Sequence, residues 1–254
     1  MGFDLGLLGK RVLVVGASKG IGKAISLGFA GEGSGLVLVA RSLGVLQELR
    51  GECETTGSAG VSIVGADITQ DPRSLAERLE VDYGPFDVVI QNVGTSLVSR
   101  DIFGDDEDYL NALNINALAA IQMNAVFMQS MIKNGIKGHI IHVSSISSKN
   151  LRGNALYGAS KEFLNAYVTA AGRQVAKHGI CLNSVMPGAV TFEGGYWDQA
   201  IKNKEPKVED FLSHHQAIGR FGTPEEIANL VLFLASDKSS FIVGSNIPID
   251  GGAM

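Results

Sequence analysis

Tyr157 and Lys161 are the residues whose types and spacing point most directly to chemistry. They lie four positions apart in a helix-length segment, residues 155–178, and so share one face of the expected helix. A tyrosine phenol ordinarily has a pKa of about 10, and a lysine ammonium group beside it favours the phenolate. The pair therefore predicts a general acid/base that gives a proton to an oxygen atom on which negative charge develops. An ordinary exposed helical pair is the alternative interpretation.

A cluster of glycines indicates a second kind of site. Gly16, Gly20 and Gly22 follow an apolar run at residues 11–15 and open a helical segment at 20–32. Glycine allows positive φ and lets the backbone approach a phosphate closely, and the N-terminus of the following helix offers unpaired N–H groups. The cluster thus predicts a site for the pyrophosphate of a dinucleotide, unless it is only a tight turn between strand and helix.

The elements that must position these residues alternate along the chain. Apolar runs typical of strands buried on both faces lie at residues 11–15, 36–40, 61–65, 86–90, 139–143, 180–185 and 241–247. Helix-length segments lie at residues 20–32, 43–56, 72–82, 106–133, 155–178 and 224–235. This alternation predicts a single α/β domain over residues 1–254, with a doubly wound, Rossmann-like parallel sheet of about seven strands and helices on both faces.

One stretch, from Pro187 to about Ile218, breaks this alternation, and the aromatic residues Phe192, Tyr196 and Trp197 lie in its first part. A long insertion in a compact domain is usually functional. We therefore expect a substrate loop at about 190–218 whose aromatic rings line an apolar pocket. The alternative is that these rings anchor the loop to the core.

Composition and charge exclude several function classes. The chain has 254 residues, of which 45% are hydrophobic, and 21 basic against 26 acidic residues give a net charge of −5. This balance predicts no nucleic-acid partner, and no apolar run approaches the ~18 residues of a membrane span. Met1–Asp4 lack the start of a secretion signal, and the two cysteines, Cys53 and Cys181, form no CxxC pair. We therefore expect a cytoplasmic protein without a membrane partner.

The five histidines show no carboxylate partner at metal-ligand spacing, so we expect no metal site.

The glycine spacing, GxxxGxG, resembles that of the short-chain dehydrogenase/reductase family, whose members are typically of this length. Further motifs in the family order extend the resemblance over essentially the whole chain: Asp67, Asn92-Val93-Gly94, Asn116, Ser144-Ser145, Tyr157-Gly158-Ala159-Ser160-Lys161, Pro187-Gly188 and Asp250-Gly251-Gly252. The chain departs from the family pattern in two motifs: it has Gln91-Asn92-Val93-Gly94 in place of Asn-Asn-Ala-Gly, and Val15 where the family often has threonine; both departures concern supporting hydrogen bonds. The resemblance implies an oxidoreductase that interconverts a ketone and a secondary alcohol with a nicotinamide cofactor.

The resemblance also implies a role for each polar residue at the catalytic end. Tyr157 transfers the proton, Lys161 also holds the nicotinamide ribose, and Asn116 holds a water next to the lysine. Two residues compete for the serine that orients the carbonyl: the family spacing of 13 residues before the tyrosine selects Ser144, whereas the strand end selects Ser145. Because residues alternate faces along a strand and a deletion in the following loop is tolerated, we choose Ser145.

The choice of cofactor follows from charge. Where NAD-specific sites usually have an acid, at the end of the second strand, the chain has Ala40, followed by Arg41 and Ser42. Lys19 lies inside the glycine loop, so two cations and no carboxylate favour the 2′-phosphate of NADP(H). The expected cofactor-binding residues are Gly16, Ser18, Lys19, Gly20, Ile21, Gly22, Arg41, Ser42, Asp67, Ile68, Asn92, Gly94, Tyr157, Lys161, Pro187, Gly188, Val190 and Thr191.

We thus expect an NADP(H)-dependent carbonyl reductase and alcohol dehydrogenase that acts on a cyclic or medium-sized hydrophobic ketone. A 3-oxoacyl thioester is the rival substrate class. A catalytically silent NADP(H)-sensing protein is the rival function, although a silent member should have lost at least one of the four catalytic residues. The resemblance further implies a homotetramer, or a homodimer, built on the helices at 106–133 and 155–178.

Overall fold

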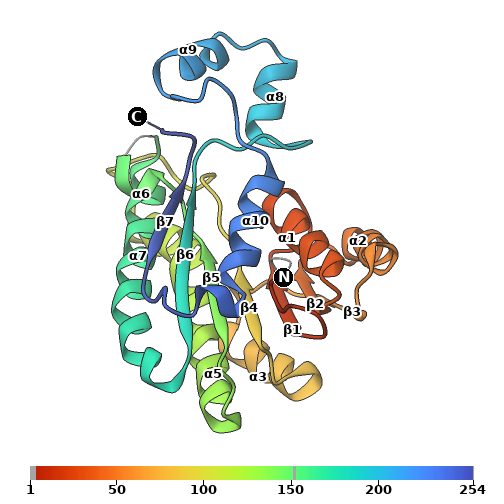
Figure 1. The fold of residues 1–254 in the computed structure, drawn as a ribbon. Coiled ribbons are helices and arrows are strands. Elements are labelled where there is room, and N and C mark those ends of the chain that lie inside the picture. The colour runs from red at the N-terminus through yellow and green to blue at the C-terminus, as the bar shows by residue number, and fades with distance from the viewer. Residues whose placement is uncertain (1–3, 151–152, 254) are drawn as a thin grey trace.

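Seven parallel strands form a single sheet at the centre of the molecule (Figure 1). The computed structural model describes residues 4–150 and 153–253, so Met1–Phe3 of the N-terminal stretch considered above lie outside the described residues. The strand order is β3-β2-β1-β4-β5-β6-β7. The strands are β1 (Arg11–Val15), β2 (Gly35–Ala40), β3 (Gly60–Gly65), β4 (Val88–Gln91), β5 (His139–Val143), β6 (Cys181–Pro187) and β7 (Asn246–Ile249).

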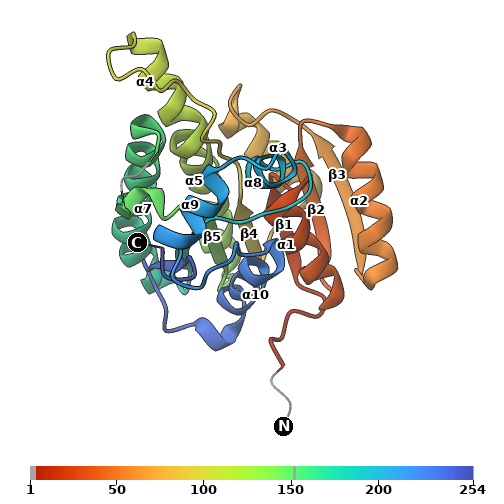
Figure 2. The same ribbon diagram turned by 90° about the horizontal axis from the view of Figure 1, so that it is seen from above.

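Helices cover both faces of this sheet (Figure 2). One apolar core lies between the sheet and α1 (Gly20–Gly31), α2 (Leu43–Thr56) and α10 (Pro224–Leu234). A second core lies between the opposite face and α3 (Pro72–Tyr83), α5 (Ala119–Asn134) and α7 (Ala155–Val175). The remaining helical segments are α4 (Asp106–Leu113), η1 (Asn114–Leu118), α6 (Ser147–Asn150), η2 (Ala176–His178), α8 (Tyr196–Lys202), α9 (Lys207–His214) and η3 (Asp237–Ser239). The expected doubly wound architecture is confirmed.

The topology creates a crevice where the order of the strands reverses, between β1 and β4. In open α/β sheets, ligands bind outside the carboxyl ends of the strands at such a point. Gly16 directly follows β1 and Asn92 directly follows β4. The Nδ2 atom of Asn92 donates a hydrogen bond of 2.8 Å to the backbone oxygen of Gly16, which joins the two sides of this crevice.

Two expected elements differ in the structure. The last strand is β7 at Asn246–Ile249 rather than residues 241–247, because Gly244 adopts a left-handed φ of +63° that interrupts the extended run. The expected helix 106–133 is divided into α4 and α5 by the π-helical turn η1. By length and composition, the segment Asp106–Asn134 could cross a membrane, but Met123, Phe127 and Met131 pack into the core against the sheet, as in a core helix of a soluble domain.

The insertion after β6 contains two short helices, α8 and α9, which stand at the carboxyl-end edge of the sheet (Figure 1). The chain leaves the sheet after Pro187 and returns to α10, whose start is fixed by a reciprocal cap. Thr223 accepts a hydrogen bond from the backbone N–H of Glu226, and the Glu226 carboxylate accepts one from the N–H of Thr223. The insertion thus has firm attachment points on either side.

Candidate active site

Ser145 and Tyr157 meet at the carboxyl end of β5. All five residues of β5 are buried, which fixes the direction in which the following serines point. A hydrogen bond with the Ser145 side chain lowers the pKa of Tyr157, so the two hydroxyl groups lie within reach of each other. The Ser144 hydroxyl instead lies 3.5 Å from the backbone oxygen of Lys161. The structure therefore brings Ser145, and not Ser144, to the tyrosine.

Tyr157 sits in the first turn of α7, where Asn154 caps the helix. The Oδ1 atom of Asn154 accepts hydrogen bonds from the N–H groups of Leu156 and Tyr157, at 3.0 and 3.2 Å. Its Nδ2 atom lies 3.0 Å from the backbone oxygens of both Val98 and Ser99, so it joins the loop after β4 to α7. The sequence analysis missed this residue, although an asparagine directly before a helical segment is a known N-cap signal.

Lys161 lies one turn further along α7 and is almost fully buried. Its Nζ atom donates a hydrogen bond of 3.0 Å to the backbone oxygen of Val143 and lies 6.0 Å from the centre of the Tyr157 ring. Burial lowers the pKa of Lys161 to about 8. Burial also raises the pKa of Tyr157, and the hydrogen bond with Ser145 opposes that rise. At neutral pH the lysine is therefore protonated, and the phenol beside it is neutral.

Asn116 lies in the π-helical turn η1 and is also buried. Its Oδ1 atom accepts a hydrogen bond of 2.8 Å from the N–H of Thr95, and its Nδ2 atom donates one of 3.0 Å to Ala112. Asn116 and Lys161 converge on Gly94, where an added Cβ would lie 3.0 Å from Asn116 Oδ1 and 2.7 Å from Lys161 Nζ. Isolated π-turns of this kind are frequent at functional sites.

The glycine loop forms a tight cradle at the N-terminus of α1. Gly16 and Gly20 adopt positive φ values of +86° and +52°. A Cβ at Gly22 would overlap the backbone oxygen of Gly16 and come 2.5 Å from Asn92 Nδ2. Ser18, Lys19 and Ile21 lie between these glycines. The loop is thus closed to side chains at the point where a phosphate could approach the helix N-terminus.

The structure puts Phe192 on the nucleotide side of the crevice. A Cβ at Gly20 would lie 2.9 Å from two ring atoms of Phe192, and the ring also borders Gly195. The sequence analysis instead expected Phe192 to line the substrate pocket. The ring reaches the glycine loop because the chain after Pro187 turns back over the carboxyl end of β1, a long-range contact that local patterns do not encode.

The turn after β6 lies next to the serine loop. Ile146 donates a backbone hydrogen bond of 3.0 Å to Pro187, and Gly188 donates one of 3.0 Å to Ile249, the last residue of β7. Val190 and Thr191 run beside Gly222, to which the Thr191 N–H donates at 3.0 Å. The Pro187-Gly188 turn is therefore fixed between the serine loop and the end of β7.

The residues expected near the adenosine part of a cofactor lie after β2 and β3. Lys19, Arg41 and Ser42 are exposed, and among the described residues neither cation forms an ion pair within 4.0 Å. Hydrogen bonds from Thr69, with a smaller contribution from Arg41, hold the pKa of Asp67 below its usual value. Ile68 is buried in the core beside Asp67. This edge of the sheet thus has two cations without a close ion-pair partner among the described residues, Lys19 and Arg41, and one ionised carboxylate, Asp67.

Trp197 belongs to a cluster of rings that joins the insertion to the segment before α10. Its ring centre lies 4.6 Å from that of Phe211 and 4.8 Å from that of Phe221. Tyr196 packs on Trp197 at 5.2 Å but is 54% exposed. These contacts correspond to the anchoring alternative for Trp197, while Tyr196 faces solvent.

The histidines lie in three different settings. His139 and His142 point to opposite faces of β5, toward Leu234 and Asn124 respectively. His214 does have a carboxylate neighbour, contrary to expectation, since its Nδ1 atom lies 3.1 Å from Asp210 Oδ1 one turn earlier on α9. Among residues 4–150 and 153–253, no group of three or more potential ligands could hold a metal ion.

Comparisons with known proteins place this geometry in context. A sequence profile described as Enoyl-(Acyl carrier protein) reductase matches residues 16–254. L-xylulose reductase of Mesocricetus auratus is 29% identical over 250 residues, which cover 98% of both chains. A 3-oxoacyl-[acyl-carrier-protein] reductase of Thermotoga maritima is 31% identical over 249 residues, 97% of this chain and 98% of the relative. The crystal structure of L-sorbose reductase from Gluconobacter frateurii, complexed with NADPH and L-sorbose, superposes with a TM-score of 0.91 at 29% identity and covers 99% of each chain.

Proposed function

The chain belongs to the short-chain dehydrogenase/reductase family of oxidoreductases that act on CH–OH and C=O groups, and from this premise we propose that it is NADP(H)-dependent and interconverts a ketone and a secondary alcohol. The observation that carries the proposal is the convergence of Ser145, Tyr157 and Lys161 at the carboxyl end of β5, beside the glycine loop. A phenol that can give a proton, an ammonium group and a hydroxyl donor, all near one point, suit proton transfer to a carbonyl oxygen.

The residues present fit a dinucleotide. The loop has glycines where a Cβ at Gly16 or Gly22 would meet neighbouring protein atoms, so its backbone is free of side chains as a pyrophosphate site requires, and the N-terminus of α1 offers N–H donors there. Lys19 and Arg41 would hold a 2′-phosphate, Asp67 the adenine, and the Pro187-Gly188 turn with Val190 and Thr191 the nicotinamide end. When bound, the cofactor supplies the hydride. The NADPH complex of the Gluconobacter reductase supports this choice of cofactor.

The chain's own residues would manage the proton. The Ser145 hydroxyl orients the substrate carbonyl, and Tyr157 gives its phenolic proton to the oxygen as charge develops. Lys161, which is charged at neutral pH, favours the resulting phenolate. Asn116 Oδ1 already accepts the Thr95 N–H, and its second lone pair is the acceptor that we propose for a relay water next to Lys161.

The test is oxidation of NADPH, with NADH in parallel, on a panel of carbonyl compounds. The panel holds L-xylulose, L-sorbose, cyclic ketones and a 3-oxoacyl thioester. Tyr157→Phe should lower kcat by about 10²–10⁴-fold, the usual contribution of a general acid. Tyr83→Phe, at the last residue of α3, is the matched control and should leave kcat unchanged. Binding of NADPH without turnover of any carbonyl would favour the nucleotide-sensing alternative.

A 3-oxoacyl thioester reductase is the second candidate function, favoured by the likeness to the Thermotoga relative. The same panel separates the two, because a thioester reductase should prefer the acyl thioester over the ketoses by kcat/KM. Tyr196, exposed at the start of α8, is the residue of the insertion best placed to meet a long substrate.

We also propose a homotetramer built on α4, α5 and α7. Leu110 and Phe163, on α4 and α7, are 63% and 47% exposed, so both helices present a large apolar side chain that an interface could cover. Light scattering coupled to size-exclusion chromatography would contradict this proposal if it gave the mass of a single chain. Cys53 and Cys181 are buried free thiols, which suits the reducing cytoplasm that we propose as the location.

A further inference from the structure

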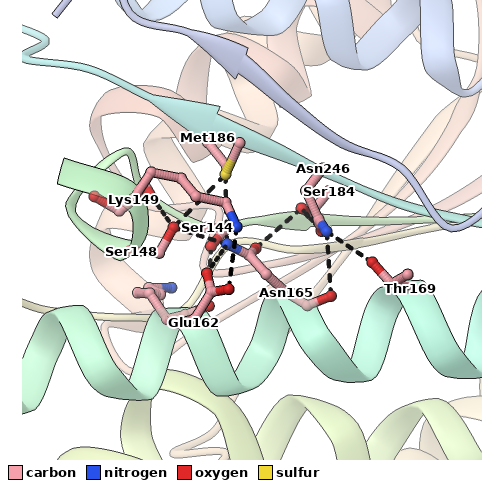
Figure 3. A network of polar contacts seen from close by, with 11 residues as sticks. Ser144, Ser148, Lys149, Glu162, Asn165, Thr169, Ser184, Met186 and Asn246 are labelled. Atoms are coloured by element: carbon pink, nitrogen blue, oxygen red, sulfur yellow. Dashed lines mark hydrogen bonds and ion pairs between the residues drawn. The ribbon is translucent and has the colours of Figure 1, made fainter. Parts of the chain in front are cut away.

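A buried chain of polar side chains connects the loop that carries Ser145 with helix α7 (Figure 3). The Ser148 hydroxyl donates a hydrogen bond of 2.8 Å to the backbone oxygen of Ser145. Asn165 Nδ2 in turn donates one of 2.8 Å to the Ser148 hydroxyl oxygen. Ser148 and Asn165 are 3% and 1% exposed, so water cannot readily replace either contact.

The chain of polar side chains continues from Asn165 to Asn246 and Thr169. The Ser184 hydroxyl lies 3.2 Å from Asn165 Oδ1 and 2.6 Å from Asn246 Oδ1. Asn246 Nδ2 donates to Thr169 Oγ1 at 2.9 Å and to the backbone oxygen of Asn165 at 3.2 Å. The orientation of Asn165 follows from Glu162, because Asn165 Nδ2 also lies 3.3 Å from the Glu162 carboxylate, which can only accept, so the amide nitrogen faces Glu162 and Ser148.

These contacts close a ring that begins and ends on one helix. Asn165 follows Lys161 by four residues and Tyr157 by eight, so all three lie on the side of α7 that faces β5 and β6. From α7 the ring runs through Asn165 and Ser148 to the main chain of Ser145, and it returns to α7 through the hydrogen bond between Ser145 and Tyr157. The separation of the two hydroxyl groups is therefore set by one rigid element.

We propose that Ser148 and Asn165 are positioning residues that hold the main chain of Ser145 so that its hydroxyl group faces that of Tyr157. The inference rests on the proposed function, in which these two hydroxyl groups meet the same carbonyl oxygen. Active-site groups need positioning to within about 0.5 Å, and such precision depends on supporting hydrogen bonds. The Ser145 oxygen also accepts the Ser148 N–H at 3.2 Å, so loss of the hydroxyl should loosen the turn without unfolding it.

The experiment compares Ser148→Ala with Ser239→Ala. Ser239 is the control, because it is equally buried and its hydroxyl also bonds to main-chain carbonyls just before it, at 2.8 Å from Leu234 and 3.0 Å from Ser236. We expect Ser148→Ala to lower kcat about tenfold with KM changed less than threefold, and Ser239→Ala to leave both unchanged. In a Ser145→Ala background, Ser148→Ala should cause no further loss, because it acts through Ser145. If Ser148→Ala lowered kcat as much in the Ser145→Ala background as it does in wild type, the proposal would be overturned.

A second readout needs neither cofactor nor substrate. Titration of the Tyr157 phenol, taken as the ultraviolet difference between each variant and the same variant carrying Tyr157→Phe, reports the hydrogen bond with Ser145. Ser148→Ala should raise the pKa of Tyr157, and Ser239→Ala should not, because the bond with Ser145 lowers that pKa. An unchanged pKa in Ser148→Ala would overturn the proposal even if wild-type protein reduced no carbonyl on the panel. Ser148→Cys, similar in size but a weaker donor, serves if the alanine variant does not fold.

Discussion

Lys161 holds its ammonium group 3.0 Å from the backbone oxygen of Val143, the last residue of β5. The side chain is almost fully buried, and burial lowers its pKa to about 8. A buried charge with this single described partner destabilises the folded state. Its position beside Tyr157 is what we expect of a charge that serves the proposed site rather than the fold.

Lys161→Met should stabilise the protein at pH 7 while it abolishes reductase activity. The change in pKa from 10.5 to about 8 corresponds to roughly 3 kcal/mol of unfavourable burial, which the variant avoids. Loss of the hydrogen bond to Val143 offsets about 1 kcal/mol of this gain. We expect thermal unfolding several degrees above that of wild type. Between pH 8 and 10.5 the folded wild type loses a proton that the unfolded chain keeps, so wild-type stability rises and the gap closes. Melting curves at pH 7 and pH 10 test this; a lower melting temperature for the variant at pH 7 would contradict it.

Gly22→Ala should disrupt the cradle for the cofactor. The new Cβ would overlap the Gly16 backbone oxygen and crowd Asn92 Nδ2, so the loop at the switch point must shift. We expect loss of measurable NADPH binding by fluorescence and a clear loss of stability. Gly51→Ala is the control, since a Cβ there meets nothing within 4 Å inside α2, and it should stabilise by about 0.5–1 kcal/mol. Normal binding by Gly22→Ala would refute the assignment of this loop.

Arg41→Ala should separate NADPH from NADH. Arg41 is exposed at the end of β2, close enough to Asp67 to contribute to its lowered pKa. Its charge would pair with a 2′-phosphate, which NADH lacks. Charge-assisted hydrogen bonds are worth about 1.5–3 kcal/mol, so the KM for NADPH should rise roughly tenfold or more while that for NADH stays constant. An equal change in KM for both cofactors would show that Arg41 does not bind the 2′-phosphate.

Phe192→Ala should increase the affinity for NADPH. The ring lies against Gly20, over the helix N-terminus where a phosphate would approach, so it must move before a dinucleotide can enter. Removal of the ring should lower the Kd several-fold in calorimetric titration. Phe241→Ala, at a fully exposed position far along the chain, is the control. Weaker binding by Phe192→Ala would mean that the ring packs on the bound nucleotide.

Regular elements were the part of this molecule that sequence reasoning predicted well. The apolar runs that became β1 and β5 are buried over nearly their whole length, and Thr223-Pro224 begins α10 as its N-cap signal indicates. The choice of Ser145 over Ser144 also followed from strand alternation, and the structure brings that residue to Tyr157. The inferences about β1, β5 and α10 succeed because they depend on residues that are neighbours in the sequence, while the catalytic role of Ser145 stays a prediction.

The contacts that were not predicted join distant segments. The ring of Phe192 reaches Gly20 across most of the chain, and Asn165 reaches Ser148 between α7 and α6. Neither has a local pattern, since a phenylalanine in a loop and an asparagine in a helix each suit many environments. Strand β7 was misplaced because the apolar run at its start contains Gly244, whose left-handed conformation ends the extended chain there.

His142 should make the protein sensitive to acid. It is fully buried on β5, where burial and, to a smaller extent, the charge of Lys161 lower its pKa to about 3. Its Nε2 atom lies 2.6 Å from Asn124 Nδ2, whose Oδ1 atom accepts from Gln91 Nε2 at 3.2 Å. Because the Asn124 amide nitrogen can only donate, His142 must accept through Nε2 and is therefore neutral in the folded chain.

The consequence is a loss of stability below pH 6.5. There the unfolded chain binds a proton at His142 that the folded chain excludes down to about pH 3, so stability falls by about 1.4 kcal/mol per pH unit in this window. Urea unfolding of wild type should thus give a free energy about 2 kcal/mol lower at pH 5 than at pH 7 from this residue. His142→Gln keeps an acceptor for Asn124 but cannot bind the proton, so its stability should change less over the same range. His178→Gln, at an exposed site in η2, should behave as wild type does. If His142→Gln lost as much stability as wild type, the acid sensitivity would have to come from other groups, and Asn124 would not hold His142 in its neutral form.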